Sequence, residues 1–361
     1  MARALKLAGR GVASTDPNPT VGCVIVKDGD VVGEGFTQPA GGNHAEIEAL
    51  NAAGEEAAGA TVYVSLEPCA HTGRTGPCAS ALIKAQVVRV VFALEDPNPA
   101  VAGKGAEMLA AAGIVVETPL LAAEAEAINR GYFSRMRRQR PWIRCKMAAS
   151  LDGRTALANG ESQWITGDAA RRDVHRSRAL ASAVMTGIGT VLADDPRLTA
   201  RVPDAGFDVR QPQRVIIDSS LRTPPTATTL GLDGEVIIFA GTGTCDPAAD
   251  QVAALERAGA RIETVAADPR CDLDAVVSRL AALEINDVWL EAGPTLAGAM
   301  VAAGLVDELI LYLAPSLLGN DARGLFALPP LAGLDERVRL HIDDLRQFGD
   351  DLRIIARPVS H

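Results

Sequence analysis

The chain has 361 residues, and at roughly 150 residues per domain this length favours two domains. Its composition, 48% hydrophobic and 22% charged, is ordinary for a globular chain that buries a sizeable core. Asp and Glu number 45 and Lys and Arg number 35, so the net charge is −10. This acidic balance argues against a protein that binds nucleic acid broadly through its phosphates.

The first residues, Met1 to Ser14, carry basic side chains but no continuous apolar core, so we expect an amphipathic helix rather than a signal peptide. No apolar run approaches the roughly 18 residues that cross a bilayer, and no membrane partner is expected. The cysteines are sparse and do not resemble a disulfide framework. They stand at positions 23, 69, 78, 145, 245 and 271. We therefore expect a cytoplasmic location.

Strand-like and helix-like runs alternate through the first 130 residues. Strands are predicted at 20–26, 31–36, 61–66, 87–94 and 114–116, the first two forming a hairpin. Helices are predicted at 44–53, 78–86, 103–112 and 121–133. This alternation is typical of an α/β fold with a largely parallel sheet flanked by helices.

A basic stretch follows, with four arginines within residues 135–140. A nucleic-acid patch and a solvated helix end are both interpretations, and the acidic surroundings favour the helix end. Pro141 marks a boundary, so we expect domains over residues 1–141 and 142–361.

The second part repeats the α/β pattern. Strands are predicted at 142–147, 183–187, 214–218, 235–240, 261–265, 287–291 and 308–313, and helices at 167–180, 272–284 and 294–303. No G-x-G-x-x-G motif follows a strand, which disfavours a Rossmann domain. Polar residues gather at 150–154, 160–166 and 190–199, which we interpret as loops at one mouth of the sheet.

The sharpest local signal is His44-Ala45-Glu46 followed by Cys69 and Cys78. A hydrolytic zinc site needs three protein ligands and one open position for water, and the histidine and the two cysteines supply them. Zinc lowers the pKa of a bound water to roughly 7, and Glu46 can take its proton and pass it to a leaving amine. Because residues two apart on a helix point to nearly opposite sides, His44 must stand at a helix start.

Each of these residues alone is more often structural, since a lone histidine or buried cysteine usually packs in a core. A His-x-Glu motif with a later Pro-Cys-x-x-Cys is the signature of zinc deaminases, although here eight residues separate the cysteines. A structural zinc would more often take four ligands and would leave Glu46 without a role.

Two segments carry a family resemblance. Residues 15–22 (TDPNPTVG) with His44-Ala45-Glu46 resemble the cytidine deaminase-like superfamily. Residues 66–78 (LEPCAHTGRTGPC) look like its riboflavin-biosynthesis branch, in which a long loop separates the ligand cysteines, although Gly76 stands where the family often has proline. The resemblance implies a three-layer deaminase domain. Within it, His71 and Arg74 could grip a substrate phosphate or sugar, and Asn18 could bond sugar or base; an exposed loop and simple turn chemistry are the alternatives.

The second part is similar to the reductase domain of the bifunctional riboflavin deaminase–reductase family, which is dihydrofolate reductase-like and uses NADPH. From the residues alone, the turn after Glu291 can cradle a phosphate at a helix start, and an ordinary strand-to-helix turn without a ligand is the alternative. The resemblance, which extends from about Met1 to Leu328, implies further contacts. For NADPH these are Ala148, Trp164, Thr190, Asp194, Ser219, Gly293, Pro294, Thr295, Leu296, Ala297, Gly298 and Ala299, and for the substrate they are Ser162, Arg178, Leu198, Arg201 and Glu291.

Together these features predict a bifunctional enzyme. Its zinc domain would hydrolytically deaminate 2,5-diamino-6-(5-phosphoribosylamino)pyrimidin-4-one, and its NADPH domain would reduce the ribosyl chain to ribityl. Lys146 and Asp194 could deliver a proton during reduction, with a strand-edge salt bridge as the competing interpretation. The alternative function is a nucleic-acid base deaminase with an appended binding domain. We expect a small-molecule substrate and no nucleic acid partner, and we carry a homo-oligomer as an open expectation.

Overall fold

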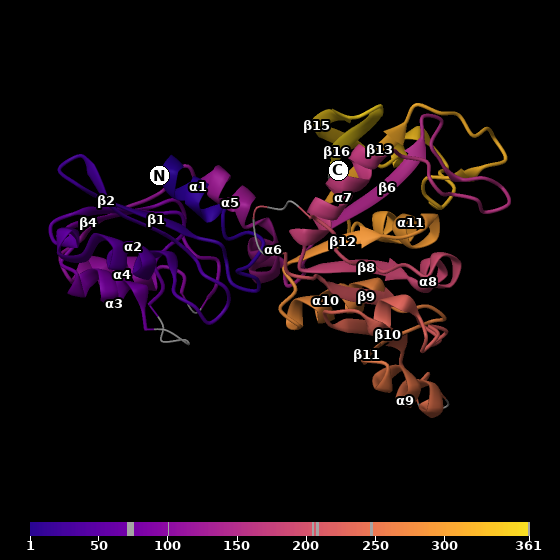
Figure 1. Ribbon diagram of the computed structural model, residues 1–361, viewed down its shortest axis with the longest axis horizontal. Coiled ribbons are helices and arrows are strands. Elements are labelled where there is room, and N and C mark those ends of the chain that lie inside the picture. Colours follow the sequence, from indigo (N-terminus) through magenta and orange to yellow (C-terminus); the bar gives the residue numbers. More distant parts are fainter. Residues whose placement is uncertain (71–75, 100, 204–205, 207–208, 246–247, 360–361) are drawn as a thin grey trace. The chain divides into compact units, whose positions relative to one another are not determined.

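The computed structural model describes residues 1–70, 76–99, 101–203, 206, 209–245 and 248–359. The chain divides into two compact units, Met1–Arg140 and Pro141–His361 (Figure 1). No helix among the described residues is long and apolar enough to cross a bilayer. The six cysteines all lie in the described ranges, and none of them forms a disulfide there.

The first unit is built on a mixed sheet in the order β2-β1-β3-β4-β5. Its strands are β1 (Gly22–Lys27), β2 (Asp30–Phe36), β3 (Thr61–Val64), β4 (Arg89–Phe92) and β5 (Val115–Glu117). The predicted hairpin is present, and β1 is antiparallel to both β2 and β3. Only β3, β4 and β5 are mutually parallel, so the sheet is less parallel than the alternation of elements indicated.

Helices cover both faces of this sheet and give the three-layer arrangement expected of the deaminase fold (Figure 1). One layer holds α2 (Ala45–Ala53), the 3-10 turn η1 (Gly54–Ala57), α3 (Cys78–Lys84) and α4 (Lys104–Ala111), and the other holds α1 (Ala2–Ala8), α5 (Ala122–Ile128) and α6 (Arg130–Arg138). A Cβ at Gly35 of β2 would lie 2.3 Å from the carbonyl oxygen of Ala45. Because Gly35 lacks that atom, the start of α2 lies directly against the sheet.

The single helix predicted over 121–133 is wrong, since two helices, α5 and α6, meet at Asn129. The side chain of Asn129 accepts from the backbone N–H of Thr20 at 2.8 Å and donates to its carbonyl at 2.9 Å. This long-range pair satisfies the backbone of the loop that precedes β1, a reason that local sequence does not reveal.

The basic stretch forms the end of α6. Arg137 pairs with Glu126 at 2.6 Å and lies over the ring of Phe133, while Arg138 bonds to Ser134. Arg135 donates to the carbonyl of Pro17 at 3.2 Å. These guanidinium groups contact their own unit, which supports the interpretation of a helix end over that of a nucleic-acid patch.

The second unit carries a sheet in the order β11-β10-β9-β8-β12-β6-β13-β16-β15. Its strands are β6 (Trp142–Ser150), β8 (Ala183–Gly187), β9 (Gln213–Ile217), β10 (Val236–Gly241), β11 (Ala260–Val265), β12 (Asp287–Glu291), β13 (Glu308–Ala314), β15 (Leu340–Phe348) and β16 (Asp351–Pro358). The run from β11 to β13 is parallel, whereas β16 and β15 are antiparallel. The carboxyl ends of β9, β8, β12 and β6 therefore meet at one edge.

The helices of this unit are α7 (Asp168–Ala179), α8 (Ile188–Asp194), α9 (Ala249–Arg257), α10 (Leu273–Ala282) and α11 (Pro294–Ala302), with short 3-10 turns at η2 (Thr228–Gly231) and η3 (Leu334–Glu336). A small separate sheet pairs β7 (Arg154–Ala156) with β14 (Arg323–Gly324). The sequence did not predict α8, α9, β7, β14 or the hairpin β15–β16. In particular, 190–194 is helical rather than a loop, because Val191 is buried and holds α8 against the core.

Candidate active sites

A candidate metal site lies in the first unit, where three side chains far apart in sequence meet. His44 Nδ1 lies 3.6 Å from Cys69 Sγ and 3.3 Å from Cys78 Sγ. All three ligand atoms lie within 4.8 Å of one another, and no fourth His, Cys, Asp or Glu of the described residues joins them. In a tetrahedral zinc site with Zn–N near 2.0 Å and Zn–S near 2.3 Å, nitrogen and sulfur stand roughly 3.5 Å apart. The donor set therefore fits zinc with one position left for a non-protein ligand.

The ends of secondary-structure elements place these ligands. His44 is the N-cap of α2 with an extended backbone (φ −74°, ψ 162°), so it stands just outside the helix, where the sequence required it to be. Cys78 is the first residue of α3, and its N–H donates to Cys69 Sγ at 3.4 Å. The N–H of Ala79 bonds to the carbonyl of Cys69 at 3.1 Å, which ties the loop after β3 to the start of α3.

Glu46 lies in the first turn of α2 and is only 4% exposed. Burial raises the pKa of its carboxyl to about 7, the negative charge of Cys69 adds to that rise, and a hydrogen bond with the Cys78 thiol opposes it. The Cys78 thiol in turn lowers the pKa of Cys69 by donating a hydrogen bond to its sulfur. The site thus combines a ready thiolate with a buried carboxyl that can exchange a proton near neutral pH.

A second buried carboxylate holds the loop that carries Cys69. Glu67 accepts hydrogen bonds from the backbone N–H groups of Asp96, Gly103 and Ala106 at 3.3, 3.0 and 3.1 Å. A Cβ at Gly105 would lie 1.9 Å from the carbonyl oxygen of Pro68, so the start of α4 touches this loop directly. Glu67 therefore fixes the backbone next to a metal ligand.

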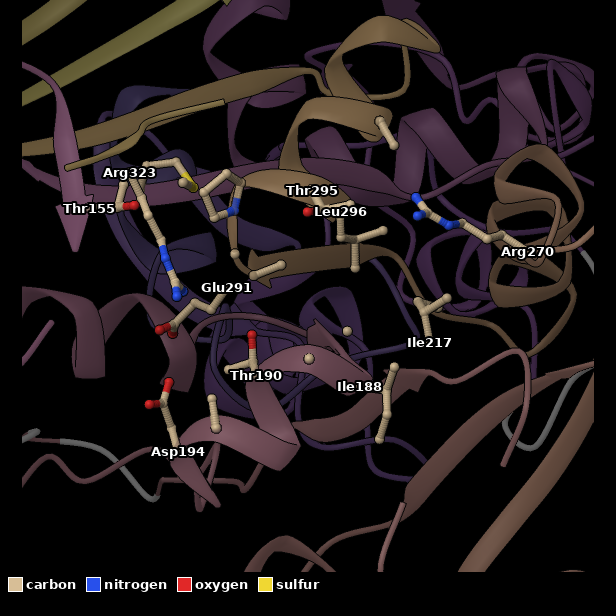
Figure 2. Close-up of a pocket in the computed structure, with 18 of the residues that line it drawn as sticks. Thr155, Ile188, Thr190, Asp194, Ile217, Arg270, Glu291, Thr295, Leu296 and Arg323 are labelled. Carbon is tan, nitrogen blue, oxygen red and sulfur yellow. The ribbon is translucent and has the colours of Figure 1, made fainter. Parts of the chain in front are cut away.

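The second unit contains a cavity of about 780 Å³ at the carboxyl ends of the parallel strands (Figure 2). This volume is in the range of cofactor sites. Most of the predicted NADPH contacts line it, together with Lys146 and the predicted substrate contacts Ser162 and Glu291. Those NADPH contacts are Ala148, Thr190, Asp194, Ser219, Gly293, Pro294, Thr295, Leu296 and Ala299.

Glu291, at the end of β12, is the electrostatic centre of one end of this cavity. Its carboxylate accepts from Arg178 at 2.5 and 2.9 Å and from the indole N–H of Trp289 at 2.8 Å. Lys146 lies 3.8 Å away. Burial raises the pKa of Glu291, but the charges of Arg178 and Lys146 outweigh burial and bring it down to about 2. The salt bridge considered for Lys146 is thus present, and the lysine also faces the cavity.

An excess of positive charge lies next to Glu291. Burial and the neighbouring guanidinium groups of Arg178 and Arg197 lower the pKa of Arg201. Burial together with Arg178 and Arg201 also lowers the pKa of His175 to about 4. A phosphate placed here would relieve the repulsion among these cations.

Both units match known families. Residues 1–94 match the cytidine and deoxycytidylate deaminase zinc-binding region, and residues 141–354 match the RibD C-terminal domain. The riboflavin biosynthesis protein RibD of Escherichia coli is 50% identical over 98% of this chain and 96% of its own length. The chain belongs to the RibD family. RibD of Mycobacterium tuberculosis is 40% identical over 95% of this chain and 93% of its own length.

Solved RibD structures have the same fold. RibD of Acinetobacter baumannii, at 45% identity, superposes with a TM-score of 0.92 over 99% of this chain and 97% of its own. A deaminase/reductase of Thermotoga maritima, at 29% identity, gives 0.85 over 99% and 97%. The predicted family, fold class, bifunctional enzyme activity in riboflavin biosynthesis and cofactors, Zn²⁺ and NADPH, are therefore confirmed.

Several predicted contacts do not reach the cavity wall. Ala297 and Gly298 are buried within α11, and Leu198 packs in the core beside α7. Trp164 is 71% exposed, with the guanidinium group of Arg171 over its ring. Arg178 reaches the cavity only through Glu291, and Arg201 bonds to His175 at 3.0 Å. These assignments stay predictions.

In the deaminase unit, Asn18 is exposed in its turn, with its backbone N–H bonded to Thr15. His71 and Arg74 lie outside the described residues. Sequence reasoning did not single out Glu67, Arg222, Arg270 and Arg323. The signal for Glu67 was its position directly after the predicted strand 61–66. The three arginines offered no such signal, because in sequence they look like any other surface arginine.

Replacing Glu67 by Ala should weaken zinc binding roughly 10- to 100-fold, the usual effect of losing a group that orients a metal ligand. Three backbone N–H groups lose their acceptor, and the loop carrying Cys69 is released from α4. Chelator competition measures the zinc affinity, and the exposed neighbour variant Glu95→Ala is the control. Unchanged affinity in Glu67→Ala would refute the positioning role.

Replacing Glu291 by Gln should lower the melting temperature of the second unit at neutral pH. The folded pKa of about 2 lies below the ordinary glutamate value, so ionisation of Glu291 contributes roughly 3 kcal/mol above pH 5. That contribution falls as the pH drops through 4 towards 2, so the difference in melting temperature between wild type and Glu291→Gln should narrow there. Calorimetry of the full chain at several pH values measures this difference, with exposed Glu256→Gln as control. A gap that does not change with pH contradicts the assignment.

Proposed function

We propose that residues 1–141 hydrolytically deaminate 2,5-diamino-6-(5-phosphoribosylamino)pyrimidin-4-one. In the same proposal, residues 142–361 reduce the product to 5-amino-6-(5-phosphoribitylamino)uracil. The observation that carries the deaminase assignment is the group of three ligands beside the buried Glu46 carboxyl. The Thermotoga relative is described as a diaminohydroxyphosphoribosylaminopyrimidine deaminase and 5-amino-6-(5-phosphoribosylamino)uracil reductase, which supports these substrates.

In the deaminase unit, His44, Cys69 and Cys78 would hold zinc, which supplies a Lewis acid able to bring the pKa of water to about 7. Glu46 accepts a proton as the water oxygen bonds to the ring carbon that bears the 2-amino group. It then donates the proton to the departing amine, so that one water is consumed and one ammonia released. A carboxyl whose pKa lies near 7 can do both.

In the reductase unit, NADPH supplies a hydride when it is bound in the cavity. The C1′–O4′ bond of the ribose opens, C1′ takes the hydride and O4′ takes a proton. Lys146 and Asp194 both line the cavity and are the candidate donors. The positive charges of Arg178 and Arg201, beside Glu291, support a position for the 5′-phosphate of the substrate near these side chains.

The N-terminus of α11 supports a diphosphate position in the middle of the cavity. Gly293 is the N-cap and Pro294 the first helical residue, and both line the cavity wall. Free backbone N–H groups and the helix dipole favour an anion there.

We also propose that the chain forms a homo-oligomer through the hairpin β15–β16. β15 lies at the edge of its sheet, where backbone groups remain open for pairing, and Leu340, Ile342 and Leu345 are 42%, 59% and 60% exposed. Sedimentation of the full chain should give a multiple of the chain mass, and Ile342→Lys with Leu345→Lys should give a monomer. A wild-type monomer contradicts the proposal.

The cytoplasmic location stays a prediction.

Replacing Glu46 by Gln should reduce ammonia release on the phosphoribosyl pyrimidine by roughly 10²- to 10⁴-fold, because proton transfer is lost. Zinc content should not change, and NADPH oxidation on the deaminated substrate should continue at the wild-type rate. Glu48→Gln, on the same helix, is the control. Ammonia release at the wild-type rate from zinc-loaded Glu46→Gln would remove Glu46 from the mechanism.

A further inference from the structure

A row of charged and aromatic side chains lies along one face of the large sheet and ends at the reductase cavity. Asp287, Trp289 and Glu291 are alternate residues of β12, so their side chains share one face of the sheet. On the neighbouring strand β6, Arg144 stands in register with Trp289, and Lys146 stands in register with Glu291. Within this row, Lys146 and Glu291 line the cavity, whereas Trp289 lies one step behind them and does not line it.

The indole of Trp289 is held on all sides. Its side chain is fully buried in a hydrophobic cluster with Val174 of α7 and Tyr312 of β13. The guanidinium group of Arg144 lies over the indole, with Cζ 5.1 Å from the ring centroid. Arg144 is itself fixed by hydrogen bonds of 2.5 and 3.1 Å to Asp287. The direction of the indole N–H is therefore set by packing behind the cavity.

The two oxygens of Glu291 are used differently. Oε1 accepts from Arg178 Nε at 2.5 Å and from the indole N–H of Trp289 at 2.8 Å. Among the described residues, Oε2 accepts one hydrogen bond, from Arg178 Nη2 at 2.9 Å, and Lys146 Nζ lies 3.8 Å away. A carboxylate oxygen has about two acceptor positions. Oε1 is therefore filled, and Oε2 keeps one position for a donor in the cavity.

We propose that Trp289 is a positioning residue of the reductase, which holds Oε1 of Glu291 and thereby directs Oε2 towards Lys146 and the substrate. The inference rests on the proposed assignment of this cavity to the reductase. Arg178 cannot make this distinction, because its two N–H groups bind both oxygens as a symmetric fork. The indole has a single N–H and binds one oxygen only. A donor group of the substrate then meets the open position on Oε2.

A large buried ring also stabilises the core, so the test must remove the N–H without removing the ring. Replacing Trp289 by β-(3-benzothienyl)alanine does this, because sulfur takes the place of the N–H in a ring system of nearly the same shape. Trp289→Phe is the second variant. It also lacks the N–H, but it leaves space in the core and should lower the melting temperature.

Calorimetric titration of the full chain with 5-amino-6-(5-phosphoribosylamino)uracil measures the effect without turnover. Both replacements of Trp289 should weaken this binding on the order of tenfold, the usual effect of losing a hydrogen bond to a charged group. The affinity for NADPH should not change. Trp142→Phe is the matched control, because Trp142 lies at the amino end of β6 and does not line the cavity.

The same replacements in a Glu291→Ala background show whether Trp289 acts through Glu291. We expect no further loss of binding there, because the group that Trp289 positions is already gone. Full wild-type affinity in the benzothienyl protein, or an equal further loss in the Glu291→Ala background, would overturn the positioning role. A wild-type chain that binds neither the uracil compound nor NADPH would instead overturn the assignment of the cavity.

Discussion

The meeting of one imidazole and two thiols within 4.8 Å is the constraint on which the deaminase unit depends. These side chains come from the start of α2, the loop after β3 and the start of α3. Burying these polar side chains around the Glu46 carboxyl costs free energy when they have no counter-charge. A bound metal cation would offset that cost. Hydrogen bonds hold the loop that carries Cys69: Glu67 accepts from the backbone N–H of Gly103, and the N–H of Ala79 in α3 donates to the carbonyl of Cys69.

The reductase unit also buries a carboxylate, and there protein side chains supply the counter-charge. Glu291 is buried, and it remains ionised because Arg178 grips it with two hydrogen bonds and Lys146 lies nearby. Relative to apolar residues of similar volume, a buried ion pair adds little net stability, although removing one partner alone is costly. Its position at the carboxyl end of a central parallel strand, where substrates bind in α/β sheets, gives it a functional rather than a stabilising explanation.

The sequence predicted the parts in which chemistry and local pattern coincide. His44, Glu46, Cys69 and Cys78 could be chosen because a catalytic zinc restricts residue types and spacing, and the position of His44 at a helix start followed from helical geometry. What could not be predicted depends on distant partners. The break at Asn129 is made by Thr20, more than a hundred residues earlier, and Leu198 turned inward because α7 covers it. The hairpin β15–β16 was missed because most of β15 is exposed and lacks a clear apolar alternation.

The absence of a side chain at Gly35 has a consequence for how such an enzyme can diversify. The backbones of β2 and α2 are in direct contact there, so no side chain between them can be enlarged or shortened to move α2. The distance between the reacting centre and the strand beneath it is fixed by peptide geometry. New pyrimidine preferences in relatives would then arise through the loops around the rim, while the position of the metal stays the same.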